Sequence, residues 1–284
     1  MNDQQRLIYL HIPKTAGTSL RQVIARQYSG QPVYMFNTQN TNRVDPLVKL
    51  PLEERARLRC VMGHTRYGIH RYLPGESTYI TLLRQPVEHI LSLYYFSLSA
   101  PDKKYGRLAS DKTLEEFVQD PEVGAFQVSY IAGLDEDQPE GSDARIRLTS
   151  TLPIEQRLEV AKAHLREDFS LVGLVEQFDE SLLLLRRKFG WKNIYYARQR
   201  VNQNRPAARQ VTPEVIEMIQ HYARPDIELY QLATELFNQQ CTVYGAALQH
   251  DLEVFCRRRE VYERAWQLTS RLRATPIYRM LRRK

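Results

Sequence analysis

Residues 7–24, LIYLHIPKTAGTSLRQVI, run from an apolar segment through a short polar loop into a second apolar pattern. The first part, Leu7 to Ile12, has the length and composition of a buried strand, and it stops at Pro13. After Thr18 and Ser19 the apolar residues recur at spacings of three and four, which is typical of the start of a helix. The stretch therefore predicts a strand, a polar loop and a helix.

The same order of strand, loop and helix returns further along the chain. Residues 78–83 (TYITLL) form an apolar, β-branched run that stops at Arg84, and Pro86 suits the first turn of a helix. The run 170–176 (SLVGLVE) predicts another strand. Shorter strands are expected at 60–62 and 193–197, and helices at 86–98, 113–119, 122–131, 154–166, 179–189, 213–223, 226–238 and 242–272. Strands that alternate with helices indicate an α/β fold with a mostly parallel sheet covered on both faces.

Two polar regions interrupt this pattern, residues 30–57 and 99–152. We expect the first to be irregular and the second to hold only short helices. Insertions of this kind often cover a substrate, so the choice of substrate is expected to lie there.

The charge of the chain is uneven. The 284 residues hold 40 Lys and Arg against 33 Asp and Glu, a formal charge of +7. Residues 257–284 contain 10 basic and 2 acidic residues (+8), which leaves 30 basic and 31 acidic residues (−1) in 1–256. The balanced body does not favour nucleic-acid binding, which needs several concentrated basic contacts.

We therefore divide the chain into a body, 1–240, and a basic amphipathic helical extension, 241–284. Three roles stay open for the extension: packing on its own domain with a solvated basic face, lying on an anionic membrane, or pairing with a partner chain.

Composition also bears on location. No stretch approaches the roughly 20 apolar residues that a membrane span needs. The cysteines at 60, 241 and 256 have neither paired nor metal-ligand spacing, which favours a reducing compartment and makes a metal site unexpected. We expect a cytoplasmic protein, with peripheral attachment at the inner membrane face as an option for the extension.

The polar loop after the first strand has the composition of an anion site. Gly17 permits close backbone approach, Lys14 supplies a point charge, and a helix N-terminus follows. The residues of this candidate phosphate or sulfate cradle are Lys14, Thr15, Ala16, Gly17, Thr18 and Ser19. It is not the loop of nucleotide triphosphatases, because no glycine precedes Lys14 and the GK[ST] ending is missing. The alternative is that Thr and Ser only cap a helix and that Lys14 is solvated.

Two further strand ends carry candidate groups. Arg84 and Ser92, eight residues apart, could grip a second phosphate if both point to the carboxyl end of the sheet. His64 follows Gly63 at the end of a short strand, where a neutral imidazole could act as a general base. The alternatives are a surface arginine with a polar helix-face serine, and a structural histidine.

Taken together, these strings resemble the carbohydrate sulfotransferase family that includes the heparan sulfate 2-O- and 6-O-sulfotransferases, over residues 6–240. The segments that carry the resemblance are HIPKTAGTS (11–19), GH (63–64), RQP (84–86), SLYY (92–95), GLVEQFD (173–179) and DIELYQLATELF (226–237). The resemblance implies a P-loop-like three-layer fold. It also implies transfer of a sulfuryl group from 3′-phosphoadenosine 5′-phosphosulfate (PAPS) to a carbohydrate or glycoconjugate hydroxyl, with no metal.

The resemblance also implies residue roles. The cradle from Lys14 to Ser19 would hold the 5′-phosphosulfate, and Arg84 with Ser92 would hold the 3′-phosphate. His64 would be the catalytic base, and Lys14 would neutralise the leaving phosphate oxygen. Relatives often complete the nucleotide site after the last strand, where this chain has Arg198, Arg200 and Asn202.

Some positions depart from the family or stay ambiguous. Gln85 and His89 stand where many relatives have Asp and Arg. Either contact with an anionic acceptor or a solvated basic loop is expected for Arg66, His70 and Arg71. Trp191 is expected in the core, with a platform for a sugar ring as the alternative. The glycosaminoglycan substrate of the relatives does not carry over.

Two other functions remain as alternatives. A P-loop kinase acting on a small molecule would need ATP, magnesium and an Asp at a strand end that the sequence does not show clearly. A non-catalytic protein would use the basic extension for docking to a membrane or partner.

Overall fold

The computed structural model describes residues 5–36, 45–99, 109, 111–133, 152–197 and 211–274. Its centre is a five-stranded sheet in the order β2-β3-β1-β4-β5, and each neighbouring pair of strands is parallel. The strands are β1 (Arg6–Leu10), β2 (Val33–Phe36), β3 (Cys60–Gly63), β4 (Ser77–Leu83) and β5 (Phe169–Leu174). The predicted parallel sheet is confirmed, and β1 at its centre is buried along its whole length, as strands covered on both faces are.

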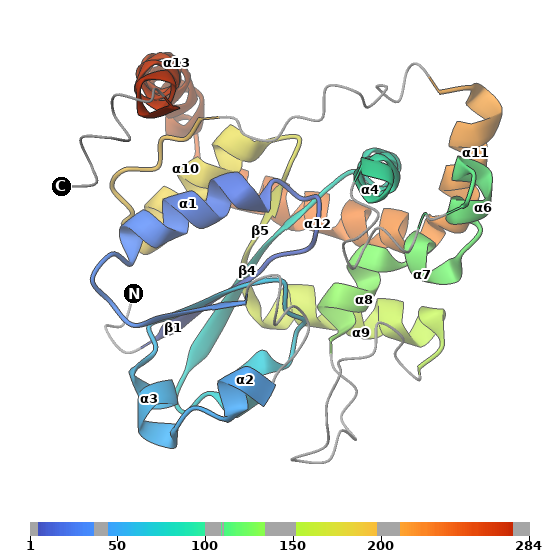
Figure 1. Ribbon diagram of the computed structural model, residues 1–284, viewed down its shortest axis with the longest axis horizontal. Helices are drawn as coiled ribbons and strands as arrows, with labels where there is room; N and C mark the ends of the chain where they lie inside the picture. Colours follow the sequence, from blue (N-terminus) through green and yellow to red (C-terminus); the bar gives the residue numbers. More distant parts are fainter. Residues whose placement is uncertain are drawn as a thin grey trace.

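Helices cover both faces of the sheet (Figure 1). On one side lie α1 and α10, and on the other α8 and α9, which confirms the expected three layers. The helices are α1 (Gly17–Gln27), α2 (Asp45–Val48), α3 (Leu52–Arg57), α4 (Pro86–Ser99), α6 (Leu114–Val118), α7 (Pro121–Gly124), α8 (Phe126–Ala132), α9 (Ile154–Glu167), α10 (Phe178–Phe189), α11 (Pro213–Tyr222), α12 (Arg224–Tyr244) and α13 (Ala247–Ala274), with the 3₁₀ turn η1 (Ile69–Tyr72).

Two sequence expectations were wrong. Strand β2 lies within residues 30–57, which we expected to be irregular; it is an edge strand of four residues, of which only Phe36 is buried, so its sequence carries little apolar signal. Residues 193–197 form no strand. Their backbone is held instead by side chains, since Arg26 donates to the Tyr195 carbonyl and Gln27 donates to the Asn193 carbonyl at 3.0 Å.

The topology directs the site to one edge of the sheet. From β1 the chain passes through α1 to β2 on one side, whereas from β4 it passes to β5 on the other. Since β1 and β4 are neighbours, their carboxyl ends flank the point at which the direction of winding reverses, where α/β folds bind ligands. The loops after these two strands contain Lys14 and Arg84.

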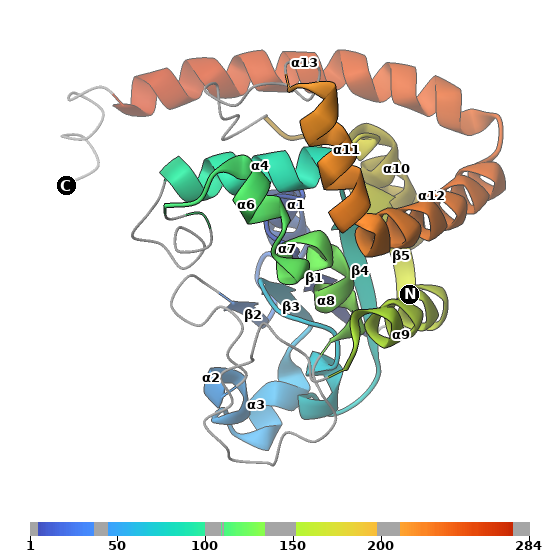
Figure 2. The same cartoon turned by 90° about the vertical axis from the view of Figure 1, so that its right-hand side faces the viewer.

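The long helix α13 runs along the outside of the molecule (Figure 2). Its first half is anchored to α10 by ion pairs of Arg186 with Asp251 at 2.8 Å and of Arg259 with Asp179 at 3.2 Å. Phe255 of α13 is buried. The described part of the extension therefore packs on the body, while its separation as a domain stays a prediction.

A buried carboxylate joins α12 to α8. Asp226, in the first turn of α12, accepts from the backbone N–H groups of Gln127 at 3.0 Å and Val128 at 2.9 Å. These N–H groups belong to the first turn of α8, and the N-cap residue of α8 forms no side-chain hydrogen bond with them. The Asp226 carboxyl therefore takes the place of the missing cap. Desolvation raises the pKa of Asp226 to about 7.

We expect Asp226 to make stability fall as pH rises. Its pKa is 3.8 in the reference state and about 7 in the fold, so between these values the folded protein keeps a proton that the unfolded chain has lost. The free energy of unfolding of the native protein, relative to Asp226→Asn, should therefore decrease across this range and level off above it. Urea titrations of both proteins at several pH values measure this. A constant difference would mean that the folded carboxyl has the same pKa as the unfolded one.

Candidate active site

The loop after β1 has an unusual backbone. Lys14 has φ 71° and Ala16 has φ 56°, so two non-glycine residues adopt the left-handed conformation within three positions. Each costs roughly 1–2 kcal/mol, and such strain concentrates at binding sites. Thr15 between them is buried, and its hydroxyl donates to the Ile12 carbonyl at 2.8 Å. Thr15 thus closes the turn from inside.

This backbone leads directly into the N-terminus of α1. The N-cap residue Ala16 offers no side-chain acceptor, and the first turn has no acidic residue. The first-turn N–H groups and the positive end of the helix dipole therefore suit an external anion. Lys14, Ala16 and Thr18 are partly exposed and alternate with buried residues, so they form the rim of the cradle. The Nζ atom of Lys14 lies 4.0 Å from the ring centroid of Phe96 in α4.

The second loop touches the first through Arg84. The Arg84 guanidinium donates to the Lys14 carbonyl at 3.1 Å and pairs with Glu88 at 3.4 Å. Its backbone is held by the Gln127 side chain, which accepts from the Arg84 N–H at 2.9 Å and donates to the Arg84 carbonyl at 2.8 Å. The sequence identifies Arg84 but not Gln127, because nothing in the chain order indicates that α8 lies beside this strand end.

His89 supports the cradle from α4. It is fully buried, and its Nε2–H donates to the Pro13 carbonyl at 2.9 Å. In the sequence it was visible only as a departure from the family pattern. Ser92 follows three residues later, on the same side of α4, and is also buried.

His64 is held by the loop residue His11. The His64 Nδ1 lies 3.0 Å from the His11 carbonyl oxygen, and the two rings stack with centroids 4.2 Å apart. Since a carbonyl oxygen can only accept, Nδ1 carries the proton and Nε2 is the basic nitrogen of the neutral ring. Gly63 before it has φ 129°, and a Cβ there would lie 2.4 Å from the Phe36 carbonyl oxygen. The glycine that precedes His64 is thus required by the close approach of β2.

His11 also contacts the helix start. A Cβ on Gly17 would lie 1.7 Å from the His11 Nε2 atom, so the ring fills the space that this glycine leaves. Burial and the neighbouring His64, Arg21 and Lys14 lower the pKa of His11 well below its ordinary value, which keeps the ring neutral. Contacts therefore connect the four sequence-predicted positions Lys14, Gly17, His64 and Arg84 into one site.

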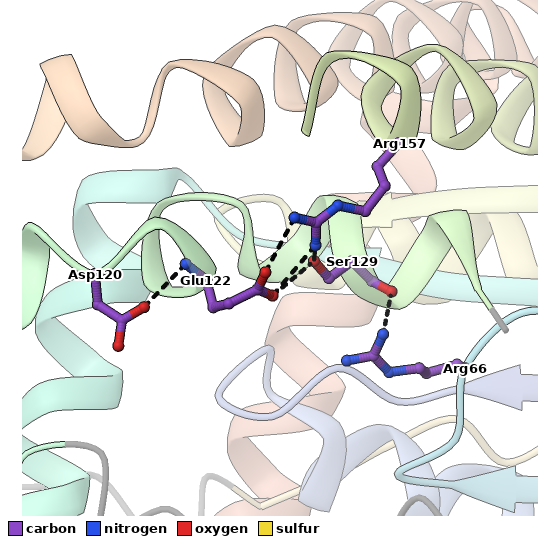
Figure 3. A network of polar contacts seen from close by, with 5 residues as sticks. All are labelled: Arg66, Asp120, Glu122, Ser129 and Arg157. Atoms are coloured by element: carbon purple, nitrogen blue, oxygen red, sulfur yellow. Dashed lines mark hydrogen bonds and ion pairs between the residues drawn. The ribbon is translucent and has the colours of Figure 1, made fainter. Parts of the chain in front are cut away.

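Some predicted residues lie elsewhere. The expectation that Arg66 contacts an acceptor or lies in a solvated loop is wrong, because it is 2% exposed and donates to the Ser129 carbonyl at 3.0 Å. Figure 3 shows Arg66 and Arg157 both meeting Ser129, with Arg157 paired to Glu122 at 3.0 Å. This network ties the loop after β3 to α7, α8 and α9.

The other expectations have mixed outcomes. His70 bonds the Tyr79 hydroxyl at 2.9 Å, and Arg71 is exposed. Trp191 is buried, as predicted. Arg200, with its neighbours at 198 and 202, lies outside the described residues. Within the described ranges, no group of three or more His, Cys, Asp or Glu could hold a metal ion, and no helix is long and apolar enough to cross a membrane.

Comparisons with known proteins agree with the resemblance seen in the sequence. A family model described as galactose-3-O-sulfotransferase matches residues 3–273. Galactose-3-O-sulfotransferase 2 of Mus musculus is 28% identical over 60% of this chain and 43% of its own length. Galactosylceramide sulfotransferase of Mus musculus is 28% identical over 61% of this chain and 40% of its own length. Heparan sulfate 2-O-sulfotransferase 1 of Gallus gallus is 24% identical over 83% of this chain and 71% of its own length.

The chain thus spans about half of the length of the galactose-3-O-sulfotransferases it matches. The crystal structure of a mouse sulfotransferase complexed with PAP aligns over 90% of this chain and 89% of that chain. Its identity is 13% and its TM-score 0.39, too low for a shared fold to follow from the alignment.

We expect Gly17→Ala to be destabilising only because of His11. The added methyl would overlap the imidazole, and overpacking of this kind costs about 1–3 kcal/mol. In a His11→Ala background the same change should be neutral or stabilising, because alanine is the better helix former. Urea unfolding of the two single variants and the double variant gives the coupling energy. If Gly17→Ala lowered the free energy of unfolding equally in both backgrounds, the His11 ring would not be the reason that position 17 needs a glycine.

Proposed function

This chain belongs to the galactose-3-O-sulfotransferase family, and we propose that it transfers a sulfuryl group from PAPS to a hydroxyl of a carbohydrate or glycoconjugate. The observation that carries the proposal is the contact of His11 with both the anion cradle at Gly17 and the candidate base His64. This single side chain brings an anion-binding helix start and a basic nitrogen together.

The cradle suits the phosphosulfate end of the donor. The first-turn N–H groups of α1 and the Lys14 ammonium offer fixed positive charge to its oxygens, with the Thr18 and Ser19 hydroxyls nearby in the chain. Arg84 and Ser92 would hold the 3′-phosphate that distinguishes this donor from ATP. The Arg84 contact with the Lys14 carbonyl joins these two anion sites.

The proposed reaction uses the tautomer that the fold imposes on His64. Its Nε2 takes the proton of the acceptor hydroxyl while that oxygen attacks sulfur in line. The new oxygen–sulfur bond forms as the bond from sulfur to the bridging phosphate oxygen breaks. The Lys14 ammonium neutralises the charge that develops on this leaving oxygen, and adenosine 3′,5′-bisphosphate departs.

The names of the relatives guide the choice of acceptor. They refer to galactose, galactosylceramide and heparan sulfate. We propose a glycan or glycolipid hydroxyl, and galactose-terminated acceptors come first in a screen. The cytoplasmic location stays a prediction.

The kinase alternative and the non-catalytic alternative make different predictions. A kinase would consume ATP with magnesium and would not produce adenosine bisphosphate from PAPS. A docking protein would turn over neither donor. One assay with both donors and a mixed set of glycans separates the three functions.

We expect His64→Ala to lower kcat about 100-fold or more, the usual contribution of a general base. The release of adenosine 3′,5′-bisphosphate in the presence of a glycan acceptor that the native protein sulfates measures this rate. His221→Ala, at an exposed position near the end of α11, is the matched control and should leave the rate unchanged. An unchanged rate in His64→Ala would exclude this residue as the base.

We expect Ser92→Ala to raise the KM for PAPS about tenfold, because the 3′-phosphate loses a charged hydrogen bond. The KM for adenosine 5′-phosphosulfate, which has no 3′-phosphate, should not change. Ser99→Ala, at the exposed end of the same helix, is the control. An equal rise for both donors would place Ser92 away from the 3′-phosphate.

A further inference from the structure

Within the part of the chain that the structure describes, helix α13 has a second apolar face that its own domain does not cover. The side that packs on the body carries Phe255, which is buried, and Arg259, which pairs with Asp179. At about 100° per residue, Val261 and Leu268 lie on the far side of the helix. They are 67% and 64% exposed.

These two residues are part of a longer stripe. Val254, Val261 and Leu268 recur at intervals of seven, and Ala265 lies beside them. Val254 is partly exposed and Ala265 is exposed. Both ribbon views place α13 at the outer surface of the molecule (Figures 1 and 2). A solvated helix face would not be expected to carry such a stripe.

Arginines flank this stripe. Arg257, Arg258 and Arg264 are exposed and lie on either side of it. Glu253 and Glu260 lie along one edge of the stripe. The chain nevertheless becomes more basic toward its end, since residues 257–284 carry a formal charge of +8. We define the outer face of α13 as Val254, Val261, Ala265 and Leu268 with Arg257, Arg258 and Arg264.

We propose that the outer face of α13 docks the protein on an anionic lipid surface. The helix would lie in the plane of the interface with Val261 and Leu268 inserted between lipids. The arginine stems would extend along the apolar stripe while their guanidinium groups reach lipid phosphates. The proposal rests on the burial and charge of α13 and is independent of the proposed enzymatic function.

The same charges disfavour a second copy of this chain as the occupant. In a parallel pair with Val254, Val261 and Leu268 in the seam, Arg257 and Arg264 would each face their own counterpart. In an antiparallel pair centred on Val261, Arg258 would lie level with Arg264 of the other copy. Like charges at such positions oppose helix pairing. Lipid headgroups of negative charge match the face without this repulsion.

Co-sedimentation of the full chain with vesicles tests the proposal. We expect binding to vesicles that contain phosphatidylglycerol, little binding to pure phosphatidylcholine, and loss of binding as salt is raised. The double variant Val261→Glu/Leu268→Glu should lower the partition coefficient about tenfold or more, because it places two charges on the inserted stripe.

Leu52→Glu is the matched control. Leu52 lies in α3 and is 61% exposed. In both ribbon views α3 lies on the opposite side of the molecule from α13 (Figures 1 and 2). The Leu52→Glu protein should therefore bind vesicles with the same partition coefficient as the native protein. A second variant, with Arg257, Arg258 and Arg264 all changed to Gln, should lose the preference for anionic vesicles while the apolar stripe stays intact.

Three results would overturn the proposal. The first is equal vesicle binding by the stripe variant and the Leu52→Glu control, and the second is equal binding to neutral and anionic vesicles. The third is a dimer of the full chain in sedimentation equilibrium that the stripe variant makes monomeric while vesicle binding is unchanged, which would assign the face to a second copy.

Discussion

The candidate site depends on one packing constraint, the fit of the His11 ring against Gly17. The end of β1 and the first turn of α1 approach so closely that only a glycine leaves room for this imidazole. The same His11 ring stacks on the His64 ring, and the His11 backbone carbonyl accepts from the His64 Nδ1–H group. The placement of His11 therefore sets both the position and the tautomer of the proposed base. The candidate anion cradle and the proposed base are therefore positioned together.

A second set of contacts supports the cradle from distant parts of the chain. His89 in α4 holds the Pro13 carbonyl, and Arg84 holds the Lys14 carbonyl. Arg84 is itself held by Gln127, whose backbone N–H bonds Asp226 at the start of α12. Contacts from α4, α8 and α12 therefore keep the strained loop after β1 in place. A loop that is held by several such contacts can keep backbone conformations that cost energy.

Much of the fold could be predicted from the sequence because buried parallel strands are apolar runs with clear ends. The central strands and the helices that follow them have such signals. The short edge strand β2 lacks them, since only one of its residues is buried. Residues 193–197 have an apolar pattern that is satisfied by packing and by the side chains of α1, so the same pattern gave a wrong strand. Arg66 was misjudged because a sequence does not show that a basic side chain has a buried network to join.

The sequence by itself determined the order of the units and the identity of the candidate anion-binding loop, because both depend on residues that are neighbours in the chain. A strand end, a glycine and a helix start within one loop are a local arrangement. Only the tertiary structure decided how His11, His64, His89 and Gln127 serve the site. Their partners are 53 residues away for the His64 bond to His11, 76 for the His89 bond to Pro13 and 43 for the Gln127 bond to Arg84, and contacts over such separations exist only once the sheet is assembled.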